Sequence, residues 1–237
     1  MTPSILIGNR RLTRADLAQL PTPDGTATHR PVPHHELIGA LVETLGFRHI
    51  AIHAEEYVVD RDALKMFGLL ELETTFNGCR FALGVRNSHD KTMRLALTVG
   101  YRVMVCENMA FHGDYEPVCA KHSKHFNLTQ ALSVGVDDMQ RHFRPMVEAV
   151  ETWRSSQLTD ERAKLTIYRA FVEEETEFPK HLAREVHRHY FHPEHDEFHP
   201  RTLWSLSNAF TSAFKALDPI PQYRATAGLA RFLGTGV

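Results

Sequence analysis

The spacing of apolar residues changes along the chain from that of a helix to that of β-strands. In residues 34–45 they recur at intervals of three and four, which predicts an amphipathic helix ended by Gly46. The period then falls to two, and strands are expected at 49–59, 66–76, 79–86, 93–100 and 102–106. Asn77-Gly78 is typical of a type I′ turn, because both residues of that turn adopt positive φ. The strands are therefore expected to form an antiparallel meander.

The second half of the chain has a helical pattern. One apolar face extends from Val136 to Trp153 and predicts a long helix, which Pro145 is expected to kink or break. Thr159 is expected to cap the next helix, which continues to about Glu177. Two more helices are expected at 179–190 and 203–217. The pattern predicts an α+β fold, an antiparallel β-meander sheet packed by helices with a mostly helical C-terminal half.

Prolines divide the N-terminus from the rest of the chain. Residues 1–33 combine Pro21, Pro23, Pro31 and Pro33 with small polar residues, which predicts an extended arm with one short helix at 13–20. We expect an α+β core with β-hairpins at 34–145 and a helical part at 146–237. These two parts are expected to fold as one cooperative unit.

Composition narrows the class of protein. The chain has 237 residues, of which 43% are hydrophobic and 24% charged, values that exclude a disordered or coiled-coil chain. Three cysteines without CxxC spacing argue against a disulfide framework, and no secretory signal is evident, so a reducing cytoplasm is expected. No apolar run approaches the roughly 20 residues of a membrane span, and no membrane association is expected.

One face of the predicted sheet combines cations with small side chains. The net charge of the chain is −2, yet residues 80–106 carry five basic residues against one acid, Asp90. Such a face would hold a phosphodiester backbone, because guanidinium groups pair with phosphate oxygens. The alternative is a face that a helix of the chain covers, with arginines at its edge. The nucleic-acid-binding candidates are Arg80, Arg86, Lys91, Arg94 and Arg102.

A second group of candidates lies in the histidine-rich run at 187–199. Its imidazoles and carboxylates are the ligand types of zinc, manganese and iron, but no HExxH is present and two prolines indicate a loop. We therefore predict no cofactor, although the residue types allow a divalent metal, with a solvated loop as the alternative. The candidate metal ligands are His192, His195, Asp196 and His199.

Other catalytic patterns are weak or missing. Ser88-His89-Asp90 resembles a triad in composition, but adjacent residues on a turn cannot normally form the required chain of hydrogen bonds. Cys106 ends an apolar strand, and such a cysteine is more often packed than reactive. The sequence contains no Walker A motif and no GxGxxG loop, so ATP use is not expected.

Four stretches of the chain resemble the phage- and plasmid-related domain of unknown function numbered 932. They are residues 20–34, 81–91, 100–111 and 197–211. This resemblance implies an association with mobile genetic elements, but no settled reaction and no catalytic residues. The residues that we assign to the family motif are Asn87, Ser88, His89, Asp90, Cys106 and Asn108.

The leading hypothesis is a non-catalytic, homo-oligomeric protein of mobile-element DNA metabolism that binds single-stranded nucleic acid and promotes strand annealing. In outline, a meander followed by a long helix is similar to single-strand annealing proteins related to the eukaryotic annealing recombinase, an analogy of fold alone. One alternative is a metal-dependent phosphodiester hydrolase, in which His89, Asp90 and the loop at 192–199 converge. The other is a protein-interaction or anti-defence module that uses the arm and the helix carrying Trp204.

Overall fold

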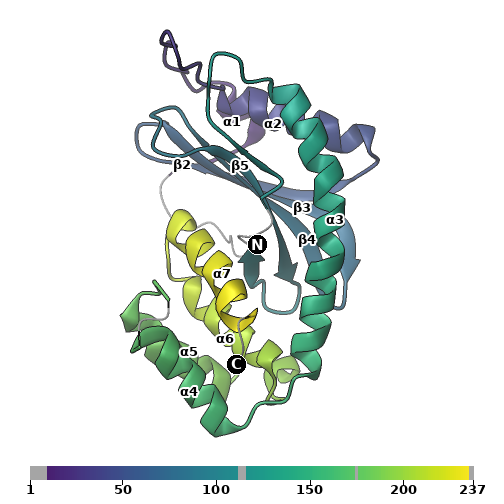
Figure 1. The fold of residues 1–237 in the computed structure, drawn as a ribbon, viewed down its shortest axis with the longest axis vertical. Coiled ribbons are helices and arrows are strands. Elements are labelled where there is room, and N and C mark those ends of the chain that lie inside the picture. Colours follow the sequence, from purple (N-terminus) through teal and green to yellow (C-terminus); the bar gives the residue numbers. More distant parts are fainter. Residues whose placement is uncertain (1–9, 112–115, 174–175, 235–237) are drawn as a thin grey trace.

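The computed structural model describes residues 10–111, 116–173 and 176–234. Within these ranges the chain folds into seven antiparallel strands and seven α-helices, with four of the helices in the C-terminal third (Figure 1). The predicted α+β class is confirmed. None of the helices described combines the length and the apolar character that crossing a lipid bilayer requires.

The sheet is a meander in which each strand pairs with its neighbour in the sequence. Its order is β1-β2-β3-β4-β5-β6, and β7 pairs with β5 beside β6. Asn77 and Gly78 have φ of 42° and 74°, which confirms the predicted turn. One strand, Leu95–Val103, takes the place of the two expected at 93–100 and 102–106, and residues 104–106 form a turn instead of a strand. The bounds are β1 Arg10–Leu12, β2 Ile52–Val59, β3 Lys65–Phe76, β4 Cys79–Ser88, β5 Leu95–Val103, β6 Met109–Phe111 and β7 Val118–Ala120.

The helices follow the predicted pattern with local differences. Thr159 accepts a hydrogen bond from the amide of Arg162 and caps its helix as expected. The long helix continues through Pro145 without a break, and the first long helix continues past Gly46. The last helix was not expected. The bounds are α1 Arg14–Leu17, α2 His34–Phe47, α3 Leu128–Ser155, α4 Asp160–Phe171, α5 Ala183–Phe191, α6 Leu203–Phe214 and α7 Pro219–Gly234, with 3₁₀ turns η1 Lys180–Leu182 and η2 Asp196–Phe198.

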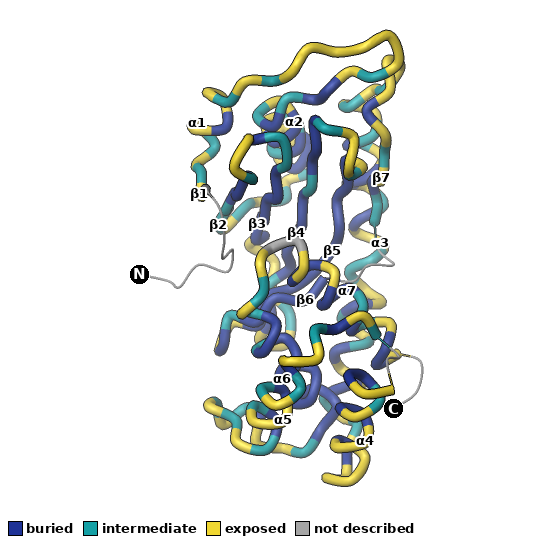
Figure 2. Tube along the Cα trace, turned by 90° about the vertical axis from the view of Figure 1, so that its left-hand side faces the viewer, coloured by how far each residue is buried: buried dark blue, intermediate teal, exposed yellow. Residues whose placement is uncertain are grey.

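Both faces of the sheet are buried. On one face Leu83, Val85, Leu97 and Val99 are fully buried, and α2 and α3 lie across this side of the sheet (Figure 1). On the other face a smaller apolar cluster reaches α7. The strands at the centre of the sheet are accordingly buried along most of their length (Figure 2). The second cluster consists of Val58, Phe67, Leu69, Ala82, Met109, Phe111 and Tyr223.

Helix α3 joins the sheet to the C-terminal helices. It packs against α2 beside the sheet and against α6 further along, and α6 in turn packs against α5 and α7. The helix crosses residue 145, where the sequence analysis placed the end of the core. Its apolar side, which includes Val136, Met146 and Trp153, is buried over this whole length.

Candidate nucleic-acid interface

The sheet face that was expected to be open is covered by the chain itself. A Cβ atom added to Gly84 would lie 2.7 Å from the Phe111 ring, and one added to Gly100 would lie 2.5 Å from the Ala110 carbonyl oxygen. The hydroxyl groups of Thr98 and Tyr223 are 2.8 Å apart, so α7 contacts the same face. Here the small side chains make room for β6 and α7. The structure therefore corrects the expectation of an open basic face in favour of a covered one.

Two of the five predicted cations are neutralised at the end of the sheet that carries the Asn77-Gly78 turn. Arg102 is buried, forms an ion pair with the buried Glu71 and lies 3.3 Å from the carboxylate of Glu107. Arg80 lies 3.4 Å from a carboxylate oxygen of Glu73 and also donates to a backbone carbonyl. Since these guanidinium groups already have anionic partners, they are not available to a phosphate without breaking those pairs.

Arg86 is engaged as well. Its guanidinium lies 2.9 Å from Glu116 and 5.4 Å from the centre of the Tyr223 ring. The Tyr223 hydroxyl donates to the same carboxylate at 2.8 Å. These groups stand at one wall of a groove of about 850 Å³ that is also lined by Phe178 and Arg224. Arg86 therefore helps to attach α7 to the sheet.

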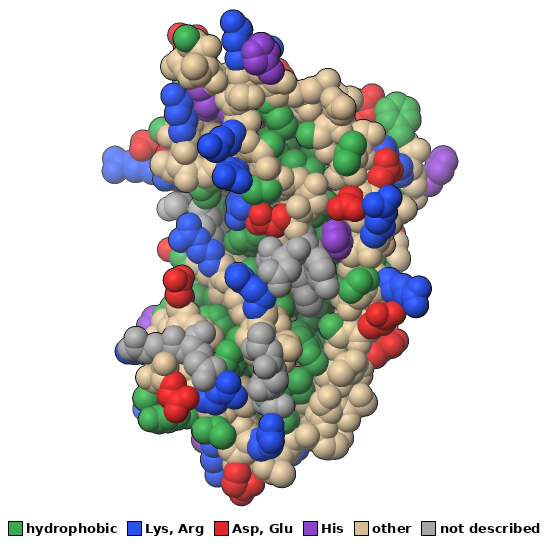
Figure 3. Space-filling view, viewed as in Figure 1, with side chains coloured by type: hydrophobic (Ala, Val, Ile, Leu, Met, Phe, Trp, Pro, Cys, Tyr) green, Lys and Arg blue, Asp and Glu red, His purple; other side chains and the backbone are tan. Residues whose placement is uncertain are grey.

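Lys91 and Arg94 differ from the other three. Both are exposed, and neither forms an ion pair within the described residues. Three further exposed cations, which the sequence analysis missed, lie on neighbouring segments. We call these five residues together the basic rim. Figure 3 shows Lys, Arg and His side chains at the upper end of the molecule, with Asp and Glu side chains among them and further basic side chains over the rest of this face. The basic rim consists of Arg30, Lys91, Arg94, Lys121 and Lys124.

Backbone contacts bring the three segments of the basic rim together. His29 and Ser123 form an isolated antiparallel bridge, and the Arg30 amide donates to the His122 carbonyl at 3.1 Å. β7 pairs with the start of β5, which places Cys119 4.0 Å from the Arg94 guanidinium. The positions at 121 and 124 carry the lysines of a short stretch rich in Lys and His, a local charge pattern that the sequence contained. Their proximity to Arg30 depends on the arm and could not be derived from spacing.

The motif around Asn87 has a structural role. The Asn87 amide donates to the Val32 carbonyl at 2.9 Å and lies 2.9 Å from Nδ1 of His34. His89 Nε2 lies 2.9 Å from the same Val32 carbonyl. These side chains attach the N-terminal arm to the end of the sheet.

Ser88 and Asp90 complete that motif without forming a catalytic triad. The Ser88 hydroxyl donates to the Asp90 carboxylate, which also accepts from the Thr92 amide at 3.0 Å and lies 3.3 Å from Lys65. Burial would raise the pKa of Asp90, but the hydrogen bonds from Ser88 and Thr92 outweigh it and lower that pKa. The Ser88 hydroxyl bonds to Asp90 and not to the ring of His89, whose Nε2 faces the Val32 carbonyl, so the chain of hydrogen bonds of a triad is not formed by these residues.

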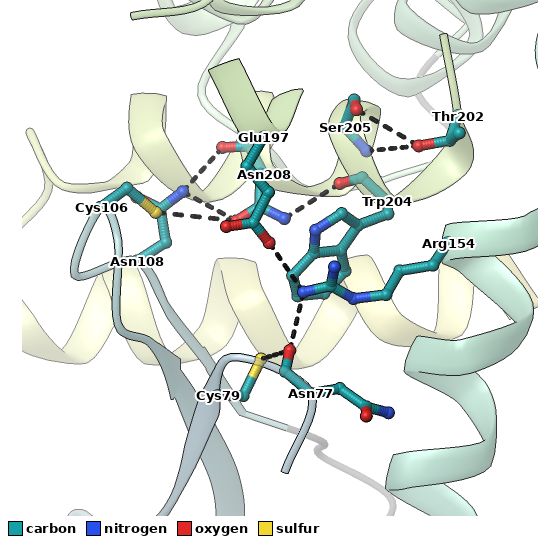
Figure 4. Close-up of polar contacts among 10 residues, drawn as sticks. All are labelled: Asn77, Cys79, Cys106, Asn108, Arg154, Glu197, Thr202, Trp204, Ser205 and Asn208. Atoms are coloured by element: carbon teal, nitrogen blue, oxygen red, sulfur yellow. Dashed lines mark hydrogen bonds and ion pairs between the residues drawn. The ribbon is translucent and has the colours of Figure 1, made fainter. Parts of the chain in front are cut away.

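Cys106 and Asn108 lie at the opposite end of the sheet. The Asn108 amide donates to the Asn208 side chain at 3.0 Å, and the Cys106 thiol lies 3.9 Å from the same oxygen (Figure 4). Lys215 donates to the Cys106 carbonyl at 2.5 Å. Burial raises the pKa of the Cys106 thiol to about 11, which keeps it protonated at neutral pH. This network attaches β6 to α6, and the predicted packing role of Cys106 agrees with it.

Arg154 connects several segments at the same end of the molecule. Its guanidinium lies 4.5 Å above the ring of Trp204, donates to the Asn77 carbonyl at 2.8 Å and pairs with Glu197 at 2.8 Å (Figure 4). Trp204 is itself buried, as is almost all of α6. The helix that carries Trp204 is thus mostly part of the core.

The histidine-rich loop does not meet the motif of His89 and Asp90. The loop lies beside α5 and α6, near Cys106, whereas His89 follows the other end of β4, about 30 Å away along the strand. Within the loop, His199 lies 3.5 Å from Asp196 in an exposed pair, His195 packs edge-on against Phe198, and His192 follows α5 as an exposed residue. In the described part of the chain, no three His, Cys, Asp or Glu side chains are placed to hold a metal ion. The convergence expected for a metal-dependent hydrolase does not occur.

Comparison with known proteins identifies the family of the chain. The model of a family described as Domain of unknown function (DUF932) matches residues 29–228, most of the chain. No curated protein and no solved structure matches the chain.

Proposed function

The chain belongs to the DUF932 family, and from this premise we propose that it binds the backbone of single-stranded nucleic acid through the basic rim, in the DNA metabolism of mobile genetic elements. Strand annealing is the activity that we assign to this binding. Of the five cations expected from the sequence, Lys91 and Arg94 remain in this surface. Arg30, Lys121 and Lys124 take the place of Arg80, Arg86 and Arg102.

The observation that carries the proposal is the absence of acidic partners on the basic rim. None of its five cations forms an ion pair within the described residues, while Arg80, Arg86 and Arg102 all do. Asp90, the acid next to Lys91 in the sequence, already accepts hydrogen bonds from Ser88 and Thr92 and forms an ion pair with Lys65. Unpaired lysine and arginine side chains neutralise phosphates and release condensed counterions, which is a main source of affinity for nucleic acids.

Two features favour a single strand over a duplex. The basic rim is formed by an arm, a turn and a strand-to-helix connection, so no exposed helix is offered to a major groove. Imidazole rings stand beside the cations, with His125 exposed and His29 half-buried. Unpaired bases can stack on such rings, whereas bases inside a duplex cannot. Because the contacts are to phosphates, we expect little dependence on sequence.

Annealing sets a requirement on the number of copies. Two complementary strands must be held at the same time, and the five cations of one basic rim can contact only a short length of strand. We therefore propose that the active form is a homo-oligomer in which several rims bind the strands side by side. Mass photometry of the protein with and without an oligonucleotide tests this step, and a monomer that anneals strands would contradict it.

The test of binding is a salt titration with a fluorescein-labelled 30-mer of deoxythymidine, followed by fluorescence anisotropy. The double variant Lys121→Gln/Lys124→Gln should reduce the slope of log K against log salt by about 1.4, since each phosphate contact with a single strand contributes about 0.7. The matched control is Lys164→Gln/Arg184→Gln, which removes two exposed cations from α4 and α5. Equal slopes for the two double variants, or no binding by the wild type, would refute the proposal.

A further inference from the structure

The arm that carries Arg30 is held on the sheet by buried histidine rings. His34 stacks on His89 with ring centres 4.0 Å apart, and His29 stacks on His122 at 5.6 Å. His34, His89 and His122 are each at least nine-tenths buried. These rings come from α2, the end of β4 and the connection before α3, and Val32 of the arm lies among them.

The contact between His122 and the arm requires a neutral ring. The Val32 amide donates to Nδ1 of His122 at 3.1 Å. An imidazole nitrogen accepts a hydrogen bond only when it carries no proton. Protonation of His122 would turn this acceptor into a donor, and two N–H groups would then face each other.

His34 has the same requirement. Its Nε2 lies 3.1 Å from the Ala63 carbonyl, which can only accept, so this nitrogen carries the proton. Nδ1 is then the acceptor for the Asn87 amide at 2.9 Å. A second proton would break that bond, and the same Asn87 amide also holds the Val32 carbonyl.

The surroundings oppose a positive charge on these rings. Burial lowers the pKa of His34 and of His122 to about 4, and the neighbouring imidazoles His89, His29 and His35 act in the same direction. Lys91 lowers the pKa of His29 further. The acids that face His89 are Asp90 and Asp60, and burial outweighs them, so the pKa of His89 is also lowered. Asp60 already accepts the amides of Leu64 and Lys65.

We propose that residues 29–34 form a proton-sensitive latch, which is closed when His34 and His122 are neutral and releases the arm, with Arg30, when they are protonated. The release itself follows from the contacts above. Its consequence for nucleic acid, the loss of Arg30 from the basic rim, rests on the proposed function.

Hydrogen exchange of the Arg30 and Val32 amides tests the latch directly. With ring pKa values of about 4 in the closed arm and 6.5 in the open one, the opening equilibrium should rise on the order of thirtyfold for each ring between pH 7.5 and pH 5. After correction for intrinsic exchange, these two amides should lose protection to that extent. The Leu83 amide at the centre of β4 is buried and exchanges only when the whole chain unfolds, so it should stay far better protected than these two amides at both pH values. Constant protection of Arg30 and Val32 in the wild type would overturn the latch.

A variant separates the rings from other effects of acid. The change His34→Gln/His122→Gln supplies amide groups that accept hydrogen bonds but do not titrate, so arm protection should become nearly independent of pH. His125→Gln, on an exposed ring of the same connection, is the control for hydrogen exchange, and its arm protection should depend on pH as that of the wild type does. Equal pH dependence in the double variant and the control would overturn the proposal, and the wild-type profile remains decisive if the double variant does not fold.

Binding of the deoxythymidine 30-mer then tests regulation. The ratio of wild-type to double-variant affinity should fall severalfold from pH 7.5 to pH 5, because acid releases the arm, with Arg30, only in the wild type. If the arm opens and this ratio stays constant, the regulatory part is wrong. If the wild type binds no oligonucleotide at any pH, the proposed function fails, and the exchange data still decide the latch.

Discussion

The two ends of strands β4 and β5 bury different kinds of polar side chains. At the end near Asn77, charges are buried as pairs, with Arg102 between Glu71 and Glu107. At the end near Ser88, the fully buried polar groups are neutral imidazoles, an amide and the Ser88 hydroxyl, while Lys91 and Arg94 are exposed to solvent. The arginines of these strands look alike in the sequence but have different surroundings.

This difference distinguishes charged residues that stabilise the fold from charged residues that are available to a ligand. A buried charge that has a partner holds the fold together, and losing the partner leaves that charge without solvent or counter-ion. An exposed cation without a partner adds little to stability and remains available to an anionic ligand. We therefore expect changes near Asn77 to affect unfolding, and changes on the basic rim to affect binding.

The largest effect should come from acid acting on the end near Ser88. The pKa values of His34 and His122 are lowered to about 4 in the folded chain from 6.5 in the unfolded one, so the unfolded state binds more protons between these values. The free energy of unfolding should therefore be highest above about pH 6.5. It should decrease by on the order of 3 kcal/mol for each ring as the pH falls toward 4. Urea unfolding at a series of pH values measures this loss. In His34→Gln/His122→Gln it should be largely absent, and an equally steep loss there would contradict the assignment.

Removal of one partner of the buried pair should rank second. Glu71→Leu leaves Arg102 buried with Glu107 alone, and we expect a loss of about 3 kcal/mol in the free energy of unfolding. The double change Glu71→Leu/Arg102→Met should recover most of it, since the only charge of the group that is left is that of Glu107, which is partly exposed to solvent. Glu73→Ala, at an exposed acid that pairs with Arg80, is the matched control and should cost less than about 1 kcal/mol.

The covered face gives the third prediction. Gly100→Ala places a methyl group against the backbone oxygen of Ala110, which cannot move without disturbing β6, and should destabilise the protein by about 2 kcal/mol. Gly84→Ala should cost less, because the ring of Phe111 can shift. Gly39→Ala on α2 meets no atom and should stabilise the helix by up to about 1 kcal/mol. Thermal unfolding followed by circular dichroism compares the three, and an unaffected Gly100→Ala would indicate that the face is open.

The smallest effect distinguishes two arginines on the candidate surface. Arg94→Gln should weaken binding of the oligonucleotide a few-fold and lower the salt slope by about 0.7, the contribution of one phosphate contact. Arg86→Gln should leave the slope unchanged, because Glu116 already neutralises that guanidinium. A larger effect of Arg86→Gln than of Arg94→Gln on the salt slope would indicate that the oligonucleotide binds in the groove beside α7 and not on the basic rim.

The sequence predicted the parts of the fold that depend on local chemistry. The turn at Asn77-Gly78 and the helix cap at Thr159 were both predicted and found, because each depends on interactions within a few residues. Pro145 was tolerated because it lies on the exposed side of α3, where the surrounding turns keep the helix continuous. Helix α7 was missed, since its apolar spacing is interrupted and its burial is set by contacts with β6.

The candidate site was only partly predictable. Cations could be counted, but whether Arg102 or Lys91 has a partner depends on strand register and on distant segments. Glu71, a single acid within an apolar strand, was the sequence feature that could have indicated the neutralisation of Arg102. Arg30 is brought near Lys121 by the bridge between His29 and Ser123 and by the bond from the Arg30 amide to the His122 carbonyl, which connect positions nearly a hundred residues apart.

The unequal burial of the cysteines provides a point of attachment for a probe. Cys79 and Cys106 are buried, and burial raises the pKa of their thiols to about 12 and about 11, while Cys119 is exposed beside Arg94. At neutral pH a maleimide dye should therefore react with the thiol of Cys119 in the unaltered protein. That dye would sit next to the proposed path of the strand, so its emission could report both the arrival of an oligonucleotide and the departure of the arm.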